Sequence, residues 1–144
     1  MRSNQRWKLA GLLLLDLVWI GFILSRSMKP AAVSSSESGW VLNLVRTVFP
    51  FATMHLVRKA AHFIEYFVLG VLHDAVCRTA CKSNLLVPSL AGLFVAAADE
   101  LLQRSIPGRS GQLSDVVLDF CGVLAACLLM RLLRTLRAKT KKTQ

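Results

Sequence analysis

Three side chains with distinct chemistry follow one another at helical spacing near the middle of the chain. Arg58, His62 and Glu65 are separated by four and three residues, with Lys59 and Tyr66 beside them. On a helix the first three share one face. A guanidinium can hold an anion, an imidazole can transfer a proton or bind a metal, and a carboxylate can act as a base. An ionisable group in a membrane helix costs roughly 2.5–3.5 kcal/mol at its centre, so partners for this face are expected.

A second set of polar residues closes one apolar block and opens the next. The acids and the amide come at the end of the third block, an arginine lies in the following turn-rich connector, and two more acids begin the fourth block. The set is Asp99, Glu100, Gln103, Arg109, Asp115 and Asp119. Because consecutive spans run antiparallel, this set and the first are expected at the same end of the molecule.

Four apolar blocks must position these residues. They cover about residues 9–25, 59–77, 85–103 and 115–133, and each is near the short end of what crosses ~30 Å of hydrocarbon. Hydrophobic residues make up 54% of the chain, which is too many for an ordinary soluble domain of this length. We predict an all-α fold, a four-helix transmembrane bundle, as one integral membrane domain over residues 1–144. Asp16 interrupts the first block and is expected to face other helices.

The connector from 26 to 57 is the longest. The serines from 34 to 38 indicate an irregular stretch, and apolar residues from 41 to 48 recur at helical spacing, beside Trp40 and before Pro50. This pattern predicts a short interfacial helix in the first extracytoplasmic loop. Packing across the mouth of the bundle explains the same pattern equally well.

The basic residues indicate the orientation of the spans. The net charge is +10 with 18 Lys and Arg residues, but these lie almost wholly at block ends and in connectors. That placement argues against nucleic-acid binding and for a lipid bilayer as the partner. Eleven of the 18 fall on the side of the termini and seven on the other side. We therefore predict that both termini are cytoplasmic and that 134–144 is a basic cytoplasmic tail.

Several other residues are given ordinary roles. Cys77 and Cys81 form a weak zinc signal, so all four cysteines are expected to be free thiols. His73 and Asp74 are read as an interfacial helix end rather than a site. Thr53 and Ser114 are expected to cap the second and fourth spans. The small residues Gly122 and Ala126 are expected to let another helix approach closely.

The predicted topology collects the polar residues in one outward-facing pocket. An enzyme would use His62, Glu65, Asp99 and Asp115 as its catalytic groups, with His62 or Glu65 as the base, and the same four could instead hold a divalent metal. The expected binding residues are Arg58, Lys59, Tyr66, Glu100, Gln103, Arg109 and Asp119. Neither a metal nor a cofactor is assigned from the sequence.

Two other functions fit the same residues. A binding or shielding module would hold a cell-envelope component or a drug, with Arg58 and Arg109 as its ligands. A purely structural ion-pair network would fix helix register without any ligand. Retained folding with lost function in Glu65→Gln or Asp99→Asn separates a site from a network.

These motifs together resemble the VanZ-like family of small bacterial membrane proteins. The matching text is Arg58-Lys59-x-x-His62-x-x-Glu65-Tyr66, Leu69-Gly70, Asp99-Glu100-x-x-Gln103, Pro107-Gly108-Arg109, and Asp115 with Asp119 and Gly122. The resemblance covers about residues 9–133. It implies a multi-pass protein of the bacterial cytoplasmic (inner) membrane acting at the cell envelope. It also implies an association with resistance to teicoplanin, and hence an envelope lipid or a glycopeptide-related ligand. It supplies no mechanism and no oligomeric state.

Overall fold

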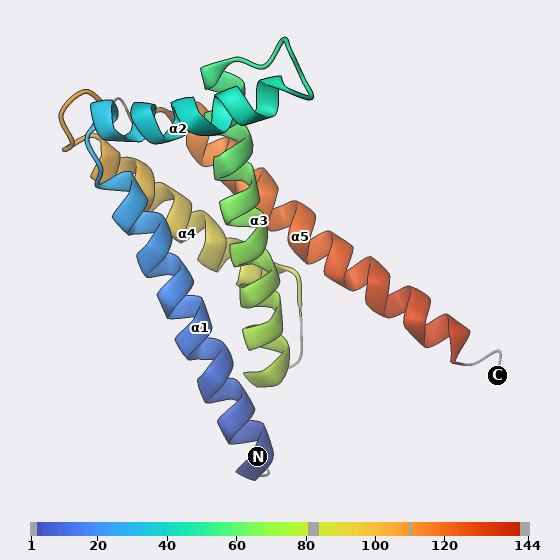
Figure 1. Cartoon of the computed structure of the whole chain (residues 1–144). Coiled ribbons are helices and arrows are strands. Elements are labelled where there is room, and N and C mark those ends of the chain that lie inside the picture. Colours follow the sequence, from blue (N-terminus) through green and yellow to red (C-terminus); the bar gives the residue numbers. More distant parts are fainter. Residues whose placement is uncertain (1–2, 81–83, 110, 142–144) are drawn as a thin grey trace.

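The computed structural model describes residues 3–80, 84–109 and 111–141, and all its regular elements are helices. Five helices follow one another: α1 Ser3–Ser27, α2 Ala31–Arg46, α3 Met54–Ala80, α4 Leu86–Gln103 and α5 Leu113–Thr140 (Figure 1). All except α2 are long and apolar enough to cross a membrane. The predicted all-α bundle of four spans is confirmed, and the helices extend beyond most of the apolar blocks into polar sequence.

The outer surface of the long helices is apolar. Leu14 is 65% exposed, Phe94 75% and Leu132 54%, and similar side chains are exposed along α1, α4 and α5. A soluble protein of this size rarely exposes so much contiguous apolar surface, because water disfavours it. These faces are suited to lipid chains, in agreement with the predicted bilayer.

Helix α2 lies across one end of the bundle, which we call the α2 end (Figure 1). The expected irregular serine stretch is wrong, because Ser34, Ser36 and Ser38 lie within this helix. The Ser36 hydroxyl donates to the Val33 carbonyl and the Ser38 hydroxyl to that of Ser34. Hydroxyls that bond back to the preceding turn are compatible with a continuous helix. The predicted short helix therefore begins about ten residues earlier than its apolar pattern, directly after Pro30.

Helix α3 is central, and it packs most closely against α5. A Cβ atom added to Gly70 would lie 2.7 Å from the Val123 carbonyl oxygen, and one added to Gly122 would lie 2.7 Å from that of Phe63. No larger residue fits at either place without moving a backbone. The expected close approach at Gly122 is confirmed, and it brings the first half of α3 against the first half of α5.

Polar side chains are buried at two levels of the bundle. One level, near the α2 end, contains the fully buried Asp99 and Asp119 beside the partly buried His62. The other contains Asp16, His73, Asp74 and Ser89, which are each at least 90% buried. His62 and His73 are eleven residues apart on α3, about 16 Å at 1.5 Å per residue. Between the two levels lies a layer of fully buried Leu69, Val123, Ala126 and Cys127.

The level around Asp74 corrects one prediction. His73 and Asp74 were expected at an interfacial helix end, but they are 6% and 2% exposed. The physical reason is that α5 continues as a helix to Thr140, so that Arg134 returns across the bundle and binds Asp74 at 2.6 and 3.0 Å. Arg134 therefore belongs to the packed bundle rather than to a basic tail.

The smaller predictions have mixed outcomes. Thr53 caps α3, because its hydroxyl accepts from the Leu56 amide. The Ser114 cap is wrong, since α5 begins at Leu113 and Gln112 occupies the cap position. Cys121 and Cys127 are free thiols. Cys81, half of the weak zinc signal, lies outside the described residues.

Candidate functional site

Three helices bring one ionisable side chain each to a common point near the α2 end. We call His62 of α3, Asp99 of α4 and Asp119 of α5 the His62 group. One nitrogen or oxygen atom from each lies within 4.8 Å of the others. The His62 Nδ1 atom is 3.5 Å from Asp119 Oδ1, and both carboxylates are 0% exposed. The close approach of α3 and α5 at Gly122 explains why His62 and Asp119 meet.

The polar atoms of the His62 group are incompletely hydrogen-bonded. Both Asp119 oxygens, Asp99 Oδ1 and His62 Nδ1 are buried and have no hydrogen-bond partner among the residues that the structure describes. The buried Tyr66 hydroxyl faces Asp99 and likewise has no partner of good geometry. Buried polar atoms in proteins are nearly always paired, so a cluster of exceptions requires a physical explanation.

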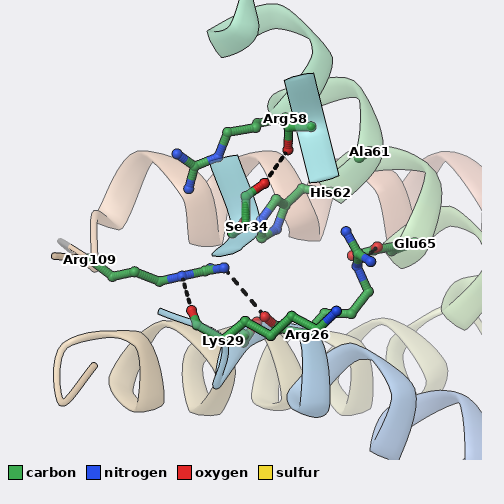
Figure 2. A pocket seen from close by; sticks show the side chains of 10 residues that line it. Arg26, Lys29, Ser34, Arg58, Ala61, His62, Glu65 and Arg109 are labelled. Atoms are coloured by element: carbon green, nitrogen blue, oxygen red, sulfur yellow. Dashed lines mark hydrogen bonds and ion pairs between the residues drawn. The ribbon is translucent and has the colours of Figure 1, made fainter. Parts of the chain in front are cut away.

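Gln103 and Arg109 fix the surroundings of this group. Gln103 Nε2 donates to Asp99 Oδ2 at 3.3 Å and to Ser27 Oγ at 3.4 Å. Arg109 donates to Gln103 Oε1 at 3.2 Å and to the backbone carbonyls of Lys29 and Arg26 (Figure 2). The α4–α5 connector is thereby tied to the end of α1. Burial, and next the nearby charge of Arg58, lower the pKa of Arg109.

A small polar pocket opens beside the His62 group (Figure 2). Its volume is about 30 Å³. Arg26 Nε and Glu65 Oε1 form an ion pair at 3.1 Å in its wall. The Arg58 guanidinium forms no hydrogen bond or ion pair with any described residue, although it lines the pocket. The lining residues are Arg26, Ser27, Lys29, Ser34, Ser38, Arg58, Ala61, His62, Glu65 and Arg109.

A wider pocket of about 370 Å³ shares three residues with the small one, Arg58, His62 and Arg109. Its wall includes Lys59 and Asp115, whose Nζ and Oδ1 atoms are 2.7 Å apart. Both side chains are about a third exposed. His62 is therefore reached from two openings, while Lys59 and Asp115 form a salt bridge at the rim.

An apolar groove of about 840 Å³ runs between α2 and α3, lined by side chains such as Val45, Phe49 and Ile64. A further hollow joins this groove to the small polar pocket. It shares Arg26, Ser38 and Ala61 with the polar pocket, and Val41, Val57 and Ala61 with the groove. The cationic small pocket and the apolar groove therefore form one continuous surface.

The structure brings most of the predicted site residues together, although their roles remain predictions. Arg58, His62, Glu65 and Arg109 line the small pocket. Asp99, Asp119 and Tyr66 are buried behind them, and Gln103 supports Asp99. Glu100 points elsewhere, because its Oε2 accepts from the Gln112 amide at 2.8 Å and so holds the α4–α5 connector.

One predicted grouping changes. His62, Glu65, Asp99 and Asp115 were the alternative set of metal ligands considered from the sequence, but the structure groups Asp119 with His62 and Asp99. Asp119 is one helical turn deeper than Asp115, opposite His62. Glu65 is instead paired with Arg26, and Asp115 with Lys59.

Sequence reasoning missed six residues that line the small pocket, which are Arg26, Ser27, Lys29, Ser34, Ser38 and Ala61. Arg26, Ser27, Ser34 and Ser38 come from the end of α1 and from α2. Arg26 and Ser27 could have been found, because they end the first span at the level where the second begins. Ser34 and Ser38 are four residues apart, a helical signal that the high serine content obscured.

These features define a multi-pass helical membrane protein with a buried acid–histidine group under a cationic pocket. The chain belongs to the VanZ/LLP1 family, whose model matches residues 12–134 and so covers most of its length. No curated protein and no solved structure matches it.

Proposed function

We propose that this protein binds an anionic, phosphate-bearing lipid of the bacterial cell envelope. The lipid head would occupy the pocket at the α2 end, and its chain would lie in the apolar groove between α2 and α3. The observation that carries the proposal is the continuity of the two, through a hollow that shares residues with both. An amphiphile has the same division into a charged and an apolar part.

The charge of the small pocket supports an anionic head. Four cationic side chains and one carboxylate line it, and that carboxylate is already paired with Arg26. The unpaired Arg58 guanidinium offers a planar set of donors that matches two phosphate oxygens. Arg109 uses three nitrogens to hold its neighbours and contributes mainly its charge.

The distribution of Lys and Arg supports a pocket on the outer side of the membrane. The start of α1 and the end of α5 lie away from the α2 end (Figure 1). The excess of basic residues on the terminal side favours cytoplasmic termini in the bacterial inner membrane. Accessibility of a cysteine introduced at exposed Phe51, compared with one at exposed Trp7, to an impermeant thiol reagent on intact cells tests this orientation.

The binding test uses the full chain purified in detergent and dioleoyl phosphatidic acid as the probe, followed by native mass spectrometry. We expect Arg58→Ala to weaken binding on the order of tenfold or more, the loss of a charge-assisted hydrogen bond. Arg131→Ala, on the exposed surface of α5, is the matched control and should bind as wild type. Equal binding by all three proteins would overturn the proposal.

The groove is tested separately. Ala60 lines the groove but neither the joining hollow nor the small polar pocket, so Ala60→Leu should obstruct the groove alone. We expect it to weaken binding of the lipid while leaving inorganic phosphate binding unchanged. An equal loss for both probes would argue for a headgroup site without a chain site.

Hydrolysis of such a lipid is a second candidate function. It is favoured by the contact between His62 and buried Asp119 beside the cationic pocket. His62 would take a proton from water, the water oxygen would bond to phosphorus, and the bond to the lipid oxygen would break as that oxygen gains a proton. Release of inorganic phosphate from phosphatidic acid, lost in His62→Gln, would establish it. Binding without release would leave a binding protein.

A role in teicoplanin susceptibility follows from the family resemblance. We expect expression of the chain in a sensitive Gram-positive host to raise the inhibitory concentration of teicoplanin, and Arg58→Ala to remove the increase. An unchanged inhibitory concentration with wild type would exclude this role while leaving lipid binding intact.

A further inference from the structure

In the described part of the chain, the His62 group brings together several buried polar atoms from different helices that lack hydrogen-bond partners. Asp99 and Asp119 are fully buried, and three of their four oxygens have no hydrogen-bond partner among the described residues. Two buried carboxylates so close together are costly unless positive charge offsets them. The nearby cations are directed elsewhere, Arg26 toward Glu65 and Lys59 toward Asp115.

We propose that His62, Asp99 and Asp119 bind a divalent metal ion, Mn²⁺ or Zn²⁺. One imidazole nitrogen and carboxylate oxygens suit these ions, and two carboxylates balance their charge. The three ligand atoms already lie within 4.8 Å of one another. Bonds of about 2.0–2.2 Å would require them to be roughly 3–4 Å apart, a closure that small side-chain rotations supply.

The surroundings of the three ligands match those of known metal centres. Ligating carboxylates are usually held by hydrogen bonds from other residues. Gln103 donates to Asp99 Oδ2 and leaves Oδ1 without a partner, so one oxygen is positioned and the other is available. Gln103 is itself held by Arg109 and Ser27. Gln103 is therefore a positioning residue of the site.

The site has an entrance and room for a further ligand. His62 lines both polar pockets, so an ion reaches the group from the α2 end. Three protein ligands leave at least one coordination position open, the arrangement found in catalytic rather than structural zinc sites. The inference deepens the proposed function, because a phosphate held by Arg58 would lie beside that position.

The test is titration of the full chain in detergent, after removal of metal with EDTA, with Mn²⁺ followed by the loss of its free-ion EPR signal. We expect one tightly bound ion per chain, displaced by Zn²⁺. Asp119→Asn should raise Kd on the order of 100-fold or more, and Gln103→Ala roughly tenfold. Size-exclusion profiles and circular dichroism show that each variant is folded.

Two controls locate the ion. Asp16→Asn changes a buried carboxylate beside His73, at the other polar level, and should leave Kd unchanged. Asp115→Asn lies one turn from Asp119 and should alter Kd by less than about threefold, because its carboxylate is paired with Lys59. Loss of binding in Asp115→Asn with retention in Asp119→Asn would move the ion to the wider pocket and overturn the assignment.

Absence of binding by wild type, for both Mn²⁺ and Zn²⁺, would overturn the metal site itself. This result is distinguishable from failure of lipid binding. Arg58→Ala should lose phosphatidic acid and keep Mn²⁺, whereas Asp119→Asn should lose Mn²⁺ and keep metal-free lipid binding. Loss of both ligands in both variants, with folding retained, would mean that the two sites are one and would contradict this separation.

Discussion

The two polar levels of the bundle contain similar residues, but they differ in how many of their polar atoms have a hydrogen-bond or ion-pair partner. At the level of Asp74, nearly every ionisable group has a partner. Asp74 accepts from Arg134 at 2.6 and 3.0 Å and from Arg78 at 3.0 Å. His73 contacts the Pro88 carbonyl at 3.3 Å and Asp16 at 3.4 Å. Only Asp16 Oδ1 and Ser89 Oγ lack a partner there among the described residues.

At the level of His62, by contrast, no described Lys or Arg side chain binds Asp99 or Asp119, and three of their four oxygens have no hydrogen-bond partner among the described residues. At both levels, removing charged groups from water costs free energy. Within the described part of the chain, only at the level of Asp74 do salt bridges offset that cost. We expect these unsatisfied atoms to distinguish a binding site from a structural network, since both levels place a histidine beside a buried aspartate. The following experiments test that distinction.

The largest effect is expected from Arg134→Ala. It leaves Asp74 buried with only Arg78, so we expect a loss of about 3 kcal/mol in the free energy of unfolding. Thermal or denaturant unfolding in detergent measures it. Arg131→Ala, on the exposed side of the same helix, should change stability by less than about 0.5 kcal/mol. A similarly small effect for Arg134→Ala would show that the Asp74 network does not stabilise the bundle.

Gly122→Ala should cost about 2 kcal/mol, because the added Cβ would lie 2.7 Å from the Phe63 carbonyl oxygen and force α3 from α5. It should also weaken Mn²⁺ binding by separating His62 from Asp119. Gly21→Ala is the control, since no atom lies within 4 Å of its added Cβ, and it should stabilise by about 0.5–1 kcal/mol. Equal effects on unfolding would contradict the tight α3–α5 contact.

Asp119→Asn should raise the free energy of unfolding of the metal-free protein, whereas Arg134→Ala should lower it. In the metal-free protein it removes a buried charge whose two oxygens accept no hydrogen bond from a described residue, so we expect stability to rise by about 1 kcal/mol. With saturating Mn²⁺ the order should reverse, because only wild type gains stability from the ion. Thermal unfolding with and without EDTA measures both. A loss of about 3 kcal/mol in EDTA would place Asp119 in a structural network like that of Asp74.

Lys59→Ala should have the smallest effect. Its salt bridge with Asp115 is about one-third exposed at the rim, and such pairs contribute about 0–1 kcal/mol. We expect unchanged unfolding and unchanged Mn²⁺ affinity. A large loss of metal affinity would extend the binding site from the His62 group to the rim.

The sequence was sufficient for the fold class and for the end of the bundle where most site residues meet. Apolar block length predicted the four spans, and the spacing of Arg58, His62 and Glu65 predicted their common face. Both signals are local, and both follow from helical periodicity. Short connectors then required antiparallel neighbours, which brought Asp99 and Asp119 to the depth of His62.

The partners of individual side chains could not be predicted in the same way. Asp74 and Arg134 are 60 residues apart, and their contact depends on how far α5 continues beyond its apolar block. The choice of Asp119 over Asp115 depends on helix rotation and on Gly122, which sets the distance between α3 and α5. Helix rotation and separation are tertiary quantities that residue spacing on one helix does not contain.

The fully buried layer of Leu69, Val123, Ala126 and Cys127 separates the two polar levels. Charged solutes do not cross such a tightly packed apolar layer, because none of its side chains replaces their hydration. An ion or phosphate that reached His62 through either polar pocket would therefore have to leave at the α2 end. We expect such a fold to exchange ligands with one side of the membrane and not to carry them across.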